Sequence, residues 1–334
     1  MKYIVTGGAG FIGSHIVDAL VVKEGHEVHV IDNLITGKLI HLKDSLIPLE
    51  DIKGKITFYD NDISNFNDAP MSEVQEIFEG VDGIFHTAAL ARIQPSFDDP
   101  DLYFRTNAEG TRNILMAAKK YRVRRVIYSA SSSAYGNLEE AEFPVTEDHK
   151  IDSQALHPYG STKRMGEMLM KDMGKMTGGP ETVCLRYFNV YGSRQTNATD
   201  GPYPTVIGIF CDLLKQGKPL TIVPDGHQRR DFTHVSDVVR ANLLAMHSPM
   251  VGGAEIINIG TGRNYSMWDV ARMMLGKNPD TDPKELLDAG LCKLIADRRG
   301  EARISLADIS KAKRLLDWEP KINLEIGLKQ LLGK

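Results

Sequence analysis

The chain opens with KYIVTGGAGFIG (residues 2–13), which joins an apolar run to a glycine-rich turn. Lys2–Thr6 has the length of a buried strand, and Phe11–Lys23 has the length and composition of a helix. The glycines of the turn follow the spacing GxxGxxG, at Gly7, Gly10 and Gly13. Glycine permits a tight turn and lets the backbone approach a pyrophosphate, while the free N–H groups of the helix start bind that anion. The stretch therefore predicts a dinucleotide-binding turn.

An acidic residue follows at the end of the next apolar run. Asp32 lies nineteen positions after Gly13, where a carboxylate accepts hydrogen bonds from the hydroxyls of the adenosine ribose. Its charge repels the 2′-phosphate of NADP, and residues 33–37 contain no Arg or Lys to compensate. The predicted cofactor is therefore NAD.

The first half of the chain alternates apolar runs with helix-length stretches such as Leu102–Tyr121. The runs are Lys2–Thr6, Glu27–Asp32, Ile56–Tyr59, Gly83–Ala88, Arg125–Ala130 and Glu181–Phe188. They are nearly continuous in Val and Ile, as in strands that are buried on both faces. This pattern predicts an α/β fold, a Rossmann doubly wound parallel sheet with helices on both sides.

The second half is less regular and predicts a smaller, mixed α/β substrate-binding domain. Ile256–Gly260 is a late strand, and Ser310–Leu316 and Leu324–Leu332 are late helices, whereas residues 277–292 form a surface loop with one short helix. We expect residues 1–188 to form the NAD-binding domain, with part of 230–262 returning to it, and residues 189–334 to bind a nucleotide sugar.

Composition excludes several classes of protein. The net charge of −4 gives no electrostatic reason to expect binding to nucleic acid. The sequence contains no run of about 18 apolar residues, so no membrane-spanning helix is expected. The three cysteines are too far apart to form a CxxC metal site or a disulfide framework, and we expect them to be buried. The first residues already form a strand, so no signal peptide is expected. Together these features predict a cytoplasmic protein without a metal.

A tyrosine and a lysine are spaced for base catalysis. In a helix, Tyr159 and Lys163 lie on one face, one turn apart. A nearby ammonium lowers the pKa of a phenol, which makes tyrosine usable as a general base. Upstream, a serine run begins at Ser131, where the strand Arg125–Ala130 ends and parallel sheets bind their ligands. We therefore expect a serine hydroxyl to pass a substrate proton to Tyr159.

Taken together, these motifs resemble the extended short-chain dehydrogenase/reductases. The resemblance covers nearly the whole chain and is closest to the UDP-sugar 4-epimerases. The motifs that carry it are Gly7-x-x-Gly10-x-x-Gly13, His86-Thr-Ala-Ala89, the serines before Tyr135-Gly136, Tyr159-x-x-x-Lys163, Leu185-Arg-Tyr-Phe-Asn-Val-Tyr-Gly192, Arg230-Asp-Phe-Thr-His-Val235 and Arg298-Arg-Gly-Glu301.

The resemblance implies a role for each matching position. The positions that match the catalytic residues of the family are Ser131, Tyr159 and Lys163. NAD is expected at Gly7, Gly10, Phe11, Ile12, Gly13, Asp32, Asn33, Asp62, Ile63, Ala88, Asn107, Tyr159, Lys163 and Tyr187. The UDP-sugar is expected at Ser131, Ser132, Tyr159, Asn189, Arg230, Arg298, Glu301 and Ser305. Arg230 and Arg298 match diphosphate-binding arginines, Glu301 matches a carboxylate on the uridine ribose, and Asn107 helps to order the active-site backbone.

Two positions bear on which sugar is accepted. Ser305 stands where a bulky Tyr narrows the sugar pocket of UDP-glucose-restricted relatives, so the resemblance implies that a 2-acetamido group is also accepted. Ala91 stands where the UDP-glucose enzymes often carry Lys. Arg92 is the neighbouring cation that could replace it.

The resulting hypothesis is a redox-neutral inversion at C4 of a UDP-hexose. Tyr159 removes the C4 hydroxyl proton directly or through Ser131, hydride moves to NAD, and the 4-keto sugar turns before hydride returns to its other face. A UDP-glucuronate 4-epimerase remains an alternative. A 4,6-dehydratase or a decarboxylase is less favoured, because Ser132 and Ser133 stand where those enzymes place carboxylates. A non-catalytic NAD-binding module is also less favoured, because the tyrosine, lysine and serine are all present.

Two helices are expected to form contacts with a second copy of the chain. Leu102–Tyr121 and His157–Met176 carry apolar residues on more than one face. In the family two such helices from each subunit form a four-helix bundle, so the resemblance implies a homodimer. Packing within the chain is the alternative.

Overall fold

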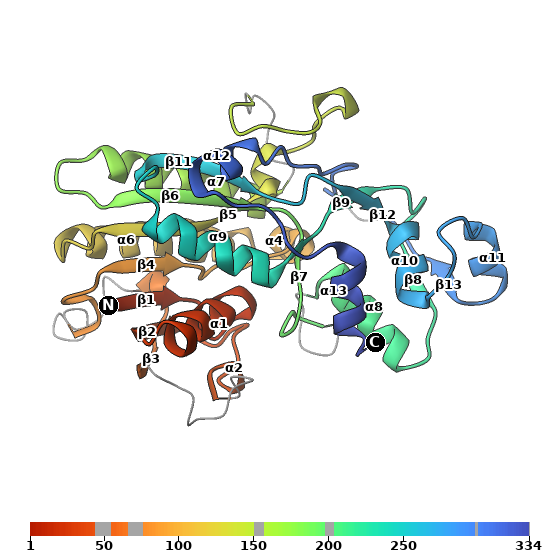
Figure 1. Ribbon diagram of the computed structural model, residues 1–334, viewed down its shortest axis with the longest axis horizontal. Coiled ribbons are helices and arrows are strands. Elements are labelled where there is room, and N and C mark those ends of the chain that lie inside the picture. The colour runs from red at the N-terminus through yellow and green to blue at the C-terminus, as the bar shows by residue number, and fades with distance from the viewer. Residues whose placement is uncertain (44–54, 66–75, 150–156, 198–203, 298–299, 334) are drawn as a thin grey trace.

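The computed structural model describes residues 1–43, 55–65, 76–149, 157–197, 204–297 and 300–333 of the 334-residue chain. Within these residues the centre is a seven-stranded parallel sheet of order β11-β6-β5-β4-β1-β2-β3 (Figure 1). Its strands are β1 (Lys2–Thr6), β2 (Glu27–Asp32), β3 (Lys55–Asp60), β4 (Gly83–His86), β5 (Arg125–Ser131), β6 (Glu181–Tyr187) and β11 (Gly253–Ile259). The predicted Rossmann-like fold class is confirmed, and the strand order reverses between β1 and β4, where such sheets bind their ligands.

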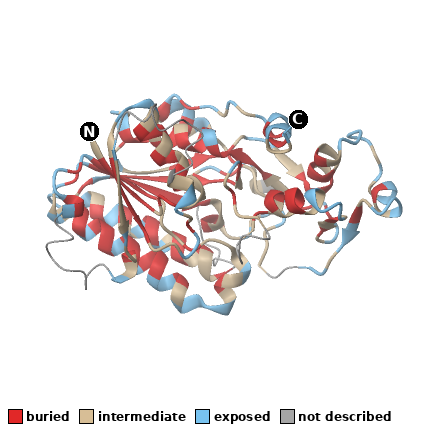
Figure 2. Cartoon of the chain, turned by 90° about the horizontal axis from the view of Figure 1, so that it is seen from below, coloured by how far each residue is buried: buried red, intermediate tan, exposed pale blue. Residues whose placement is uncertain are grey.

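Helices cover both faces of this sheet because its strands are apolar on both sides. Ile4 and Val5, adjacent in β1, belong to separate hydrophobic clusters on opposite faces. One face is covered by α1 (Phe11–Asp18), α9 (Val235–His247) and α12 (Ser310–Leu316), and the other by α6 (Gly110–Lys120) and α7 (Pro158–Lys175). Figure 2 shows the central strands as a buried layer, whereas the edge strands β3 and β11 are partly exposed. The near-continuous apolar runs therefore identify the sheet correctly.

Two of the three long predicted helices contain a π-helical turn, whereas His157–Met176 is the uninterrupted helix α7 (Pro158–Lys175). The predicted helix Phe11–Lys23 is α1 followed by a π-helix, Ala19–Lys23. The predicted helix Leu102–Tyr121 starts earlier, as α5 (Pro100–Phe104), and passes through a π-helix, Arg105–Glu109, into α6. Asp99 caps α5 by accepting a hydrogen bond from the Leu102 N–H at 2.9 Å, which explains the earlier start. The prediction therefore places the helical segments correctly but misses their internal irregularity.

A second cluster of apolar side chains lies in the C-terminal part of the chain, away from the large sheet. It joins α8 (Val206–Lys215), α10 (Met267–Leu275), α11 (Pro283–Asp288), α13 (Leu324–Leu331), β8 (Leu220–Ile222) and β13 (Cys292–Leu294). Two short strand pairs connect to it, β7 (Val190–Tyr191) with β10 (Thr233–His234), and β9 (Arg229–Asp231) with β12 (Asn264–Ser266). Shorter elements are α2 (Ile40–Lys43), α4 (Ile93–Asp98) and the 3₁₀ turns Ile63–Asn65, Ser132–Tyr135 and Glu140–Glu142. Here α11 is the short helix expected within residues 277–292.

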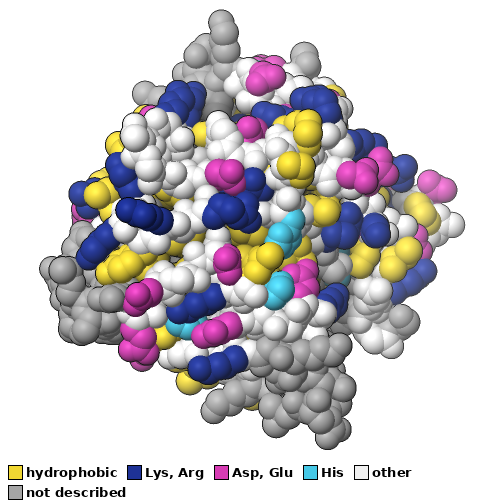
Figure 3. Space-filling model, turned by 60° about the vertical axis from the view of Figure 1, so that its left-hand side comes forward, with side chains coloured by type: hydrophobic (Ala, Val, Ile, Leu, Met, Phe, Trp, Pro, Cys, Tyr) yellow, Lys and Arg dark blue, Asp and Glu magenta, His cyan; other side chains and the backbone are white. Residues whose placement is uncertain are grey.

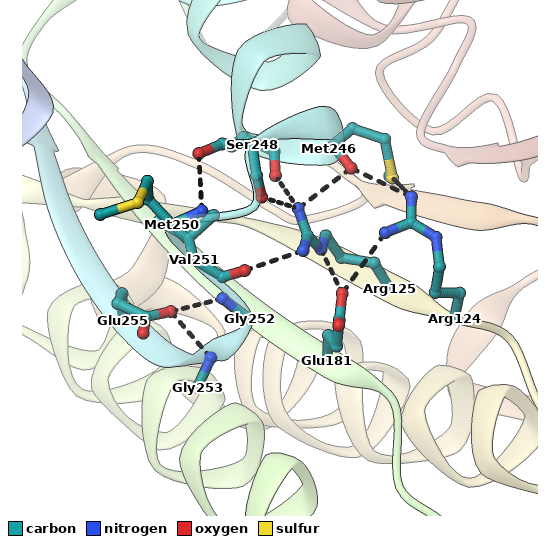
Figure 4. Close-up of polar contacts among 11 residues, drawn as sticks. Arg124, Arg125, Glu181, Met246, Ser248, Met250, Val251, Gly252, Gly253 and Glu255 are labelled. Carbon is teal, nitrogen blue, oxygen red and sulfur yellow. Dashed lines mark hydrogen bonds and ion pairs between the residues drawn. The ribbon is translucent and has the colours of Figure 1, made fainter. Parts of the chain in front are cut away.

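A buried arginine ties β5 to the end of α9 (Figure 4). The Arg125 guanidinium donates hydrogen bonds to the carbonyls of Ala245, Met246, Ser248 and Val251 at 2.8 to 3.1 Å. Its Nε pairs with the Glu181 carboxylate at 2.7 Å. Since the last carbonyls of a helix have no partners within it, this guanidinium caps α9.

The surface is charged and mixed in sign. In Figure 3 basic and acidic side chains are interspersed with apolar groups over the visible face. Cys184, Cys211 and Cys292 are buried, as predicted. Among the described helices, none has both the length and the apolar character needed to cross a membrane.

Candidate active site

A cleft of about 700 Å³ lies at the carboxyl ends of β1, β2, β4, β5 and β6 and extends to residues of the C-terminal part. Most of the predicted site residues line it. They are Gly7, Gly10, Phe11, Ile12, Gly13, Asp32, Asn33, Ile63, Ala88, Ser131, Ser132, Tyr159, Tyr187, Asn189, Arg230 and Glu301. One continuous cleft therefore brings together the residues predicted to hold a dinucleotide and those predicted to hold a sugar nucleotide.

The glycine-rich turn leaves no room for side chains. A Cβ on Gly7, whose φ is +67°, would lie 2.7 Å from the backbone of Ala88, and a Cβ on Gly13 would overlap the Gly7 carbonyl oxygen. Helix α1 begins at Phe11, its N-cap residue Gly10 has no side chain to cap it, and its first turn contains no acidic residue. The helix start therefore offers uncapped N–H groups to a phosphate. The turn fits the pyrophosphate of a dinucleotide.

Asp32 lies at the end of β2 and faces the same turn. Its carboxylate accepts hydrogen bonds from the Ala9 N–H at 3.0 Å and from the Leu34 N–H at 2.8 Å. Burial raises the pKa of Asp32, and these two backbone hydrogen bonds oppose the shift. Asp32 thus holds the loop that follows β2 against the glycine-rich turn, in addition to its predicted contact with ribose.

Asp62 is placed just outside the cleft. It accepts hydrogen bonds from the Asn33 side chain at 3.1 Å and from the Ser64 hydroxyl at 2.7 Å. Its neighbour Ile63 lines the cleft. The predicted pair is therefore split, with Ile63 facing the cleft and Asp62 supporting Asn33.

Tyr159 is the second residue of α7, and four groups surround its ring. The Ser131 hydroxyl lies near the Tyr159 phenol in the wall of the cleft. The His157 ring stacks on it at 5.9 Å between centroids, and the Tyr103 ring meets it edge-on at 6.3 Å. Burial raises the pKa of Tyr159, while the Ser131 hydroxyl and the charge of Arg92 lower it. The serine hydroxyl is therefore the candidate group to relay a proton to the phenol.

Lys163 lies one turn further along α7, as the spacing predicts. Its ammonium donates a hydrogen bond to the Ser129 carbonyl at 2.8 Å and lies 4.9 Å from the centre of the Tyr128 ring. Burial lowers its pKa to about 7, opposed by the charge of Glu167. The Lys163 side chain therefore points toward the backbone of β5, and its expected effect on the pKa of Tyr159 stays a prediction.

Asn107 does not line the cleft but connects two of its walls. Its amide bonds both backbone groups of Leu90, at 2.8 and 3.0 Å, and donates to the Thr162 hydroxyl at 3.0 Å. The loop after β4 is thereby attached to α7, between Tyr159 and Lys163. This placement agrees with the ordering role that the resemblance implies.

The C-terminal wall of the cleft carries the predicted substrate residues. Arg230 in β9 forms an ion pair with Glu301 at 3.4 Å. Asn189 donates hydrogen bonds to the Ser305 hydroxyl and to the Asp231 carbonyl, both at 3.0 Å. Ser305 lines a smaller cavity of about 90 Å³, which shares Asn189 and Arg230 with the large cleft. The predicted Arg298 lies outside the described residues.

Sequence reasoning missed two features beside Tyr159. The stacking of His157 was not expected, and burial lowers the pKa of that imidazole to about 4. Arg92 lines the cleft with a backbone φ of +92°, which non-glycine residues rarely adopt. The only signal for Arg92 was the absence of a lysine at Ala91, and no sequence pattern indicates the conformation.

The model of the NAD dependent epimerase/dehydratase family matches residues 3–260. A putative UDP-glucose 4-epimerase from Methanocaldococcus jannaschii is 35% identical, over 99% of this chain and 97% of its own length. A UDP-glucuronate 4-epimerase from Thermodesulfobacterium geofontis is 33% identical, over 99% and 95%. The structure of a UDP-N-acetylglucosamine 4-epimerase from Methanobrevibacter ruminantium M1, in complex with UDP-N-acetylmuramic acid, has a TM-score of 0.83 at 30% identity and covers 99% of this chain and 97% of that one.

The fold and the cleft thus define a Rossmann-type, NAD-dependent enzyme. The chain belongs to the NAD dependent epimerase/dehydratase family, and it is an isomerase. The predicted resemblance and the predicted cofactor are both confirmed.

Proposed function

We propose that this protein inverts C4 of UDP-hexoses, interconverting UDP-glucose with UDP-galactose and UDP-GlcNAc with UDP-GalNAc. One observation carries the proposal. The phenol of Tyr159 and the hydroxyl of Ser131 line the same cleft as the glycine-rich turn and the ion pair of Arg230 with Glu301. One cleft thus contains a base, a dinucleotide site and a cation for a diphosphate. An internal oxidation and reduction requires this, because the sugar and the dinucleotide must lie side by side next to the base.

The cofactor end of the cleft would hold NAD through the turn at Gly7 to Gly13 and through Asp32. When bound, NAD supplies a hydride acceptor that later becomes the hydride donor. The N–H groups at the start of α1 neutralise the pyrophosphate, and Asp32 disfavours the 2′-phosphate of NADP. Ile63 and Tyr187 give the remaining wall its apolar surface.

The proton is handled by Tyr159 and Ser131. As a phenolate, Tyr159 accepts the proton of the C4 hydroxyl, either directly or through the Ser131 hydroxyl, and later returns it. The stacked His157 ring does not compete for the proton, because its lowered pKa keeps it neutral near pH 7. Lys163 would orient the nicotinamide ribose from its place against β5.

The nucleotide end must hold UDP firmly while the hexose turns. Arg230 provides a guanidinium for the diphosphate, and burial lowers its pKa while Glu301 opposes that shift. Glu301 would accept hydrogen bonds from the uridine ribose. The assignment of Arg298 as the second diphosphate arginine stays a prediction.

Room for a 2-acetamido group is the reason to include the N-acetylhexosamines. The cavity of about 90 Å³ opens beside Ser305 and has apolar walls from Leu138, Phe143 and Phe188. The Asn189 amide and the Ser133 hydroxyl add polar groups that suit an amide. A tyrosine at position 305 would fill this space, whereas serine leaves it open.

A UDP-glucuronate 4-epimerase is the second candidate, supported by the relative from T. geofontis. Dehydration or decarboxylation is less favoured. Among the described residues that line the cleft, the carboxylates are Asp32 and Glu301. Asp32 is bonded to the glycine-rich turn and Glu301 is paired with Arg230, so neither is the acid or base beside Ser131 that these reactions need. Ser132 and Ser133 line the wall beside Ser131 and supply no acid.

We further propose the division into an NAD-binding domain (1–188 with part of 230–262) and a nucleotide-sugar-binding domain (189–334). The place of β11 in the large sheet and the separate C-terminal apolar cluster support this division. A homodimer is also proposed, because α5, α6 and α7 expose the apolar side chains of Phe104, Met116, Met165 and Met168. A cytoplasmic location is proposed as well. A monomeric mass in solution would refute the dimer.

The test is to incubate the purified protein separately with UDP-glucose, UDP-GlcNAc and UDP-glucuronate, without added reductant, and to resolve the products. The matching C4 epimers of the first two sugars are expected. An epimer from UDP-glucuronate alone would favour the second candidate. A 4-keto-6-deoxy or pentose product would refute epimerisation.

A further inference from the structure

We propose that His157 is a positioning residue of the reaction, whose ring fixes the orientation of the Tyr159 ring in the cleft. His157 lies two positions before Tyr159, at the N-cap of α7, and is buried. It contacts three parts of the molecule, which are the first turn of α7, the ring of Tyr159 and the ring of Phe97 in α4. This role rests on the proposed function, because His157 acts through the base of that reaction.

A helix cap fixes the imidazole to the helix that carries Tyr159. His157 Nδ1 accepts a hydrogen bond from the Gly160 N–H at 3.0 Å, and the His157 carbonyl accepts one from the Ser161 N–H at 3.2 Å. Because Nδ1 is the acceptor, the ring proton lies on Nε2. Pro158 follows at the start of the helix, where its ring restricts the backbone. The side chain and the backbone of His157 are therefore both bound to the first turn of α7.

The same cap places the imidazole over the phenol ring. Side chains two positions apart within a helix do not face each other, so a stack between residues 157 and 159 requires a backbone outside the helix. His157 has such a backbone, with φ −161° and ψ 158°. Its ring lies almost parallel to that of Tyr159, with 7° between the planes and 5.9 Å between the centroids. Since Tyr103 of α5 also meets the phenol ring edge-on at 6.3 Å, two rings from separate elements hold it.

The imidazole is supported in turn by Phe97. The Phe97 ring meets it edge-on, with 6.5 Å between the centroids and 76° between the planes. The same ring packs against the backbone of Gly300, where an added Cβ would lie 3.2 Å from two of its carbons. Gly300 precedes Glu301, which forms the ion pair with Arg230 on the C-terminal wall of the cleft. A continuous series of contacts therefore joins that wall to the ring of the base.

The imidazole also has the chemistry that a positioning group needs. Burial lowers the pKa of His157 to about 4, so near pH 7 the ring is neutral and Nδ1 can accept the capping hydrogen bond. Proton transfer requires the phenol within hydrogen-bond reach of the reacting hydroxyl, and a misplacement of about 1 Å costs roughly a hundredfold in rate. A stacked, neutral ring restricts such a displacement without taking the proton itself.

Two substitutions separate the stack from the cap. His157→Asn keeps a capping side chain and removes the ring, whereas His157→Phe keeps a ring and removes the acceptor. His234→Asn is the matched control, because His234 caps α9 through its Nδ1 while its ring contacts Tyr191 instead. Thermal melting should place His157→Asn close to the wild type and His157→Phe lower, because only the second loses the cap.

A spectroscopic measurement follows the Tyr159 ring without turnover. The NAD-bound protein is labelled with [ζ-¹³C]tyrosine, whose labelled carbon lies on the ring axis, so that ring flips do not divide its signal. The signal of Tyr159 is the one absent from Tyr159→Phe. We expect it to be single and narrow in the wild type, His157→Phe and His234→Asn, and broadened or divided in His157→Asn. A single narrow signal in His157→Asn would overturn the proposal.

Kinetics then distinguish positioning from stability. For a UDP-hexose that the wild type converts, kcat of His157→Asn should fall about tenfold to a hundredfold with KM little changed. His157→Phe and His234→Asn should keep kcat close to the wild-type value. The less stable variant is thus expected to be the more active one, which a merely structural role of His157 would not produce. Full kcat in His157→Asn, or equal losses in His157→Asn and His157→Phe, would overturn the proposal.

Two further outcomes keep the test decisive. If His157→Asn fails to fold, as thermal melting would show, His157→Ser, which also caps a helix, takes its place. Failure of the wild type to convert any UDP-hexose would refute the proposed function. The ¹³C signal of Tyr159 would then still decide whether His157 holds the ring.

Discussion

The amide of Asn189 donates a hydrogen bond to the hydroxyl of Ser305 at 3.0 Å, across 116 positions of the sequence. The contact brings the segment after β6 and the segment after Glu301 to the mouth of the smaller cavity. Ser305 Oγ also accepts a hydrogen bond from the Asp231 N–H at 3.2 Å, so the hydroxyl is held against the wall and the cavity stays open. The size of residue 305 therefore decides how much space this cavity offers.

Replacing Ser305 with Tyr should make the enzyme selective for sugars without the acetamido group. The larger ring would occupy the cavity, so kcat/KM for UDP-GlcNAc should fall by about tenfold or more while that for UDP-glucose stays close to the wild-type value. Ser305→Ala, which removes the hydroxyl but not the space, is the control and should still accept both. Equal losses on the two substrates would show that the cavity does not hold the acetamido group.

Replacing Tyr159 with Phe should abolish proton transfer and leave the dinucleotide site intact. Loss of a general base costs roughly 10²–10⁴-fold in rate, and we expect turnover to fall in that range. The glycine-rich turn is formed by other residues, so the bound NAD measured after denaturation should match the wild type. A variant that keeps full activity would remove Tyr159 from the mechanism.

Lys163 should make the stability of the NAD-free protein depend on pH. Burial lowers its pKa from 10.5 to about 7, so between these values the unfolded chain binds more protons and the free energy of unfolding rises with pH. Lys163→Met removes this contribution. It should therefore raise the melting temperature most at and below pH 7, with a gain that shrinks toward pH 10, although activity is lost.

Lys171, exposed on the same helix, is the matched control for that experiment. Lys171→Met should leave the pH dependence of stability as it is in the wild type. A stabilisation by Lys163→Met that is the same at pH 6 and pH 10 would contradict the lowered pKa of the buried amine.

Arg125 and its neighbour Arg124 offer a comparison of a buried and an exposed cation. The Arg125 side chain is 4% exposed and that of Arg124 is 49% exposed, and both contact Glu181. Arg125→Met leaves the carbonyls at the end of α9 without their buried donor, and an unsatisfied buried acceptor costs about 1–3 kcal/mol, so the loss of unfolding free energy should be at least that large. Arg124→Met should cost less than about 1 kcal/mol. Urea denaturation measures both, and equal losses would contradict the role given to burial.

Much of the site was predictable because its motifs consist of residues that are close together in the sequence. The spacing of Gly7, Gly10 and Gly13 after a strand, and of Tyr159 and Lys163 in a helix, depends on neighbours within a turn or two. The strand of Asp32 was placed with its observed ends for the same reason. Such patterns indicate the periodicity of a helix or strand and the conformation of a turn, which depend on only a few neighbouring residues.

The rest depends on contacts between distant segments. The direction of Lys163 follows from a carbonyl of β5, and the strained backbone at Arg92 follows from anchors on Tyr103 and Asn107. Strand β4 ends at His86 rather than at Ala88, because the Ala88 N–H bonds the side chain of Thr6 instead of continuing the ladder. No pattern along the chain contains these contacts, since each joins residues that only the fold brings together.

The most direct measurement follows a deuterium label at C4 of UDP-GlcNAc through the reaction in ordinary water. If hydride leaves C4 and returns to C4 within the cleft, the UDP-GalNAc produced should carry the label at C4, and no deuterium should appear in the solvent. Loss of the label to water, or a product in which C4 is not inverted, would contradict an internal oxidation and reduction at that carbon.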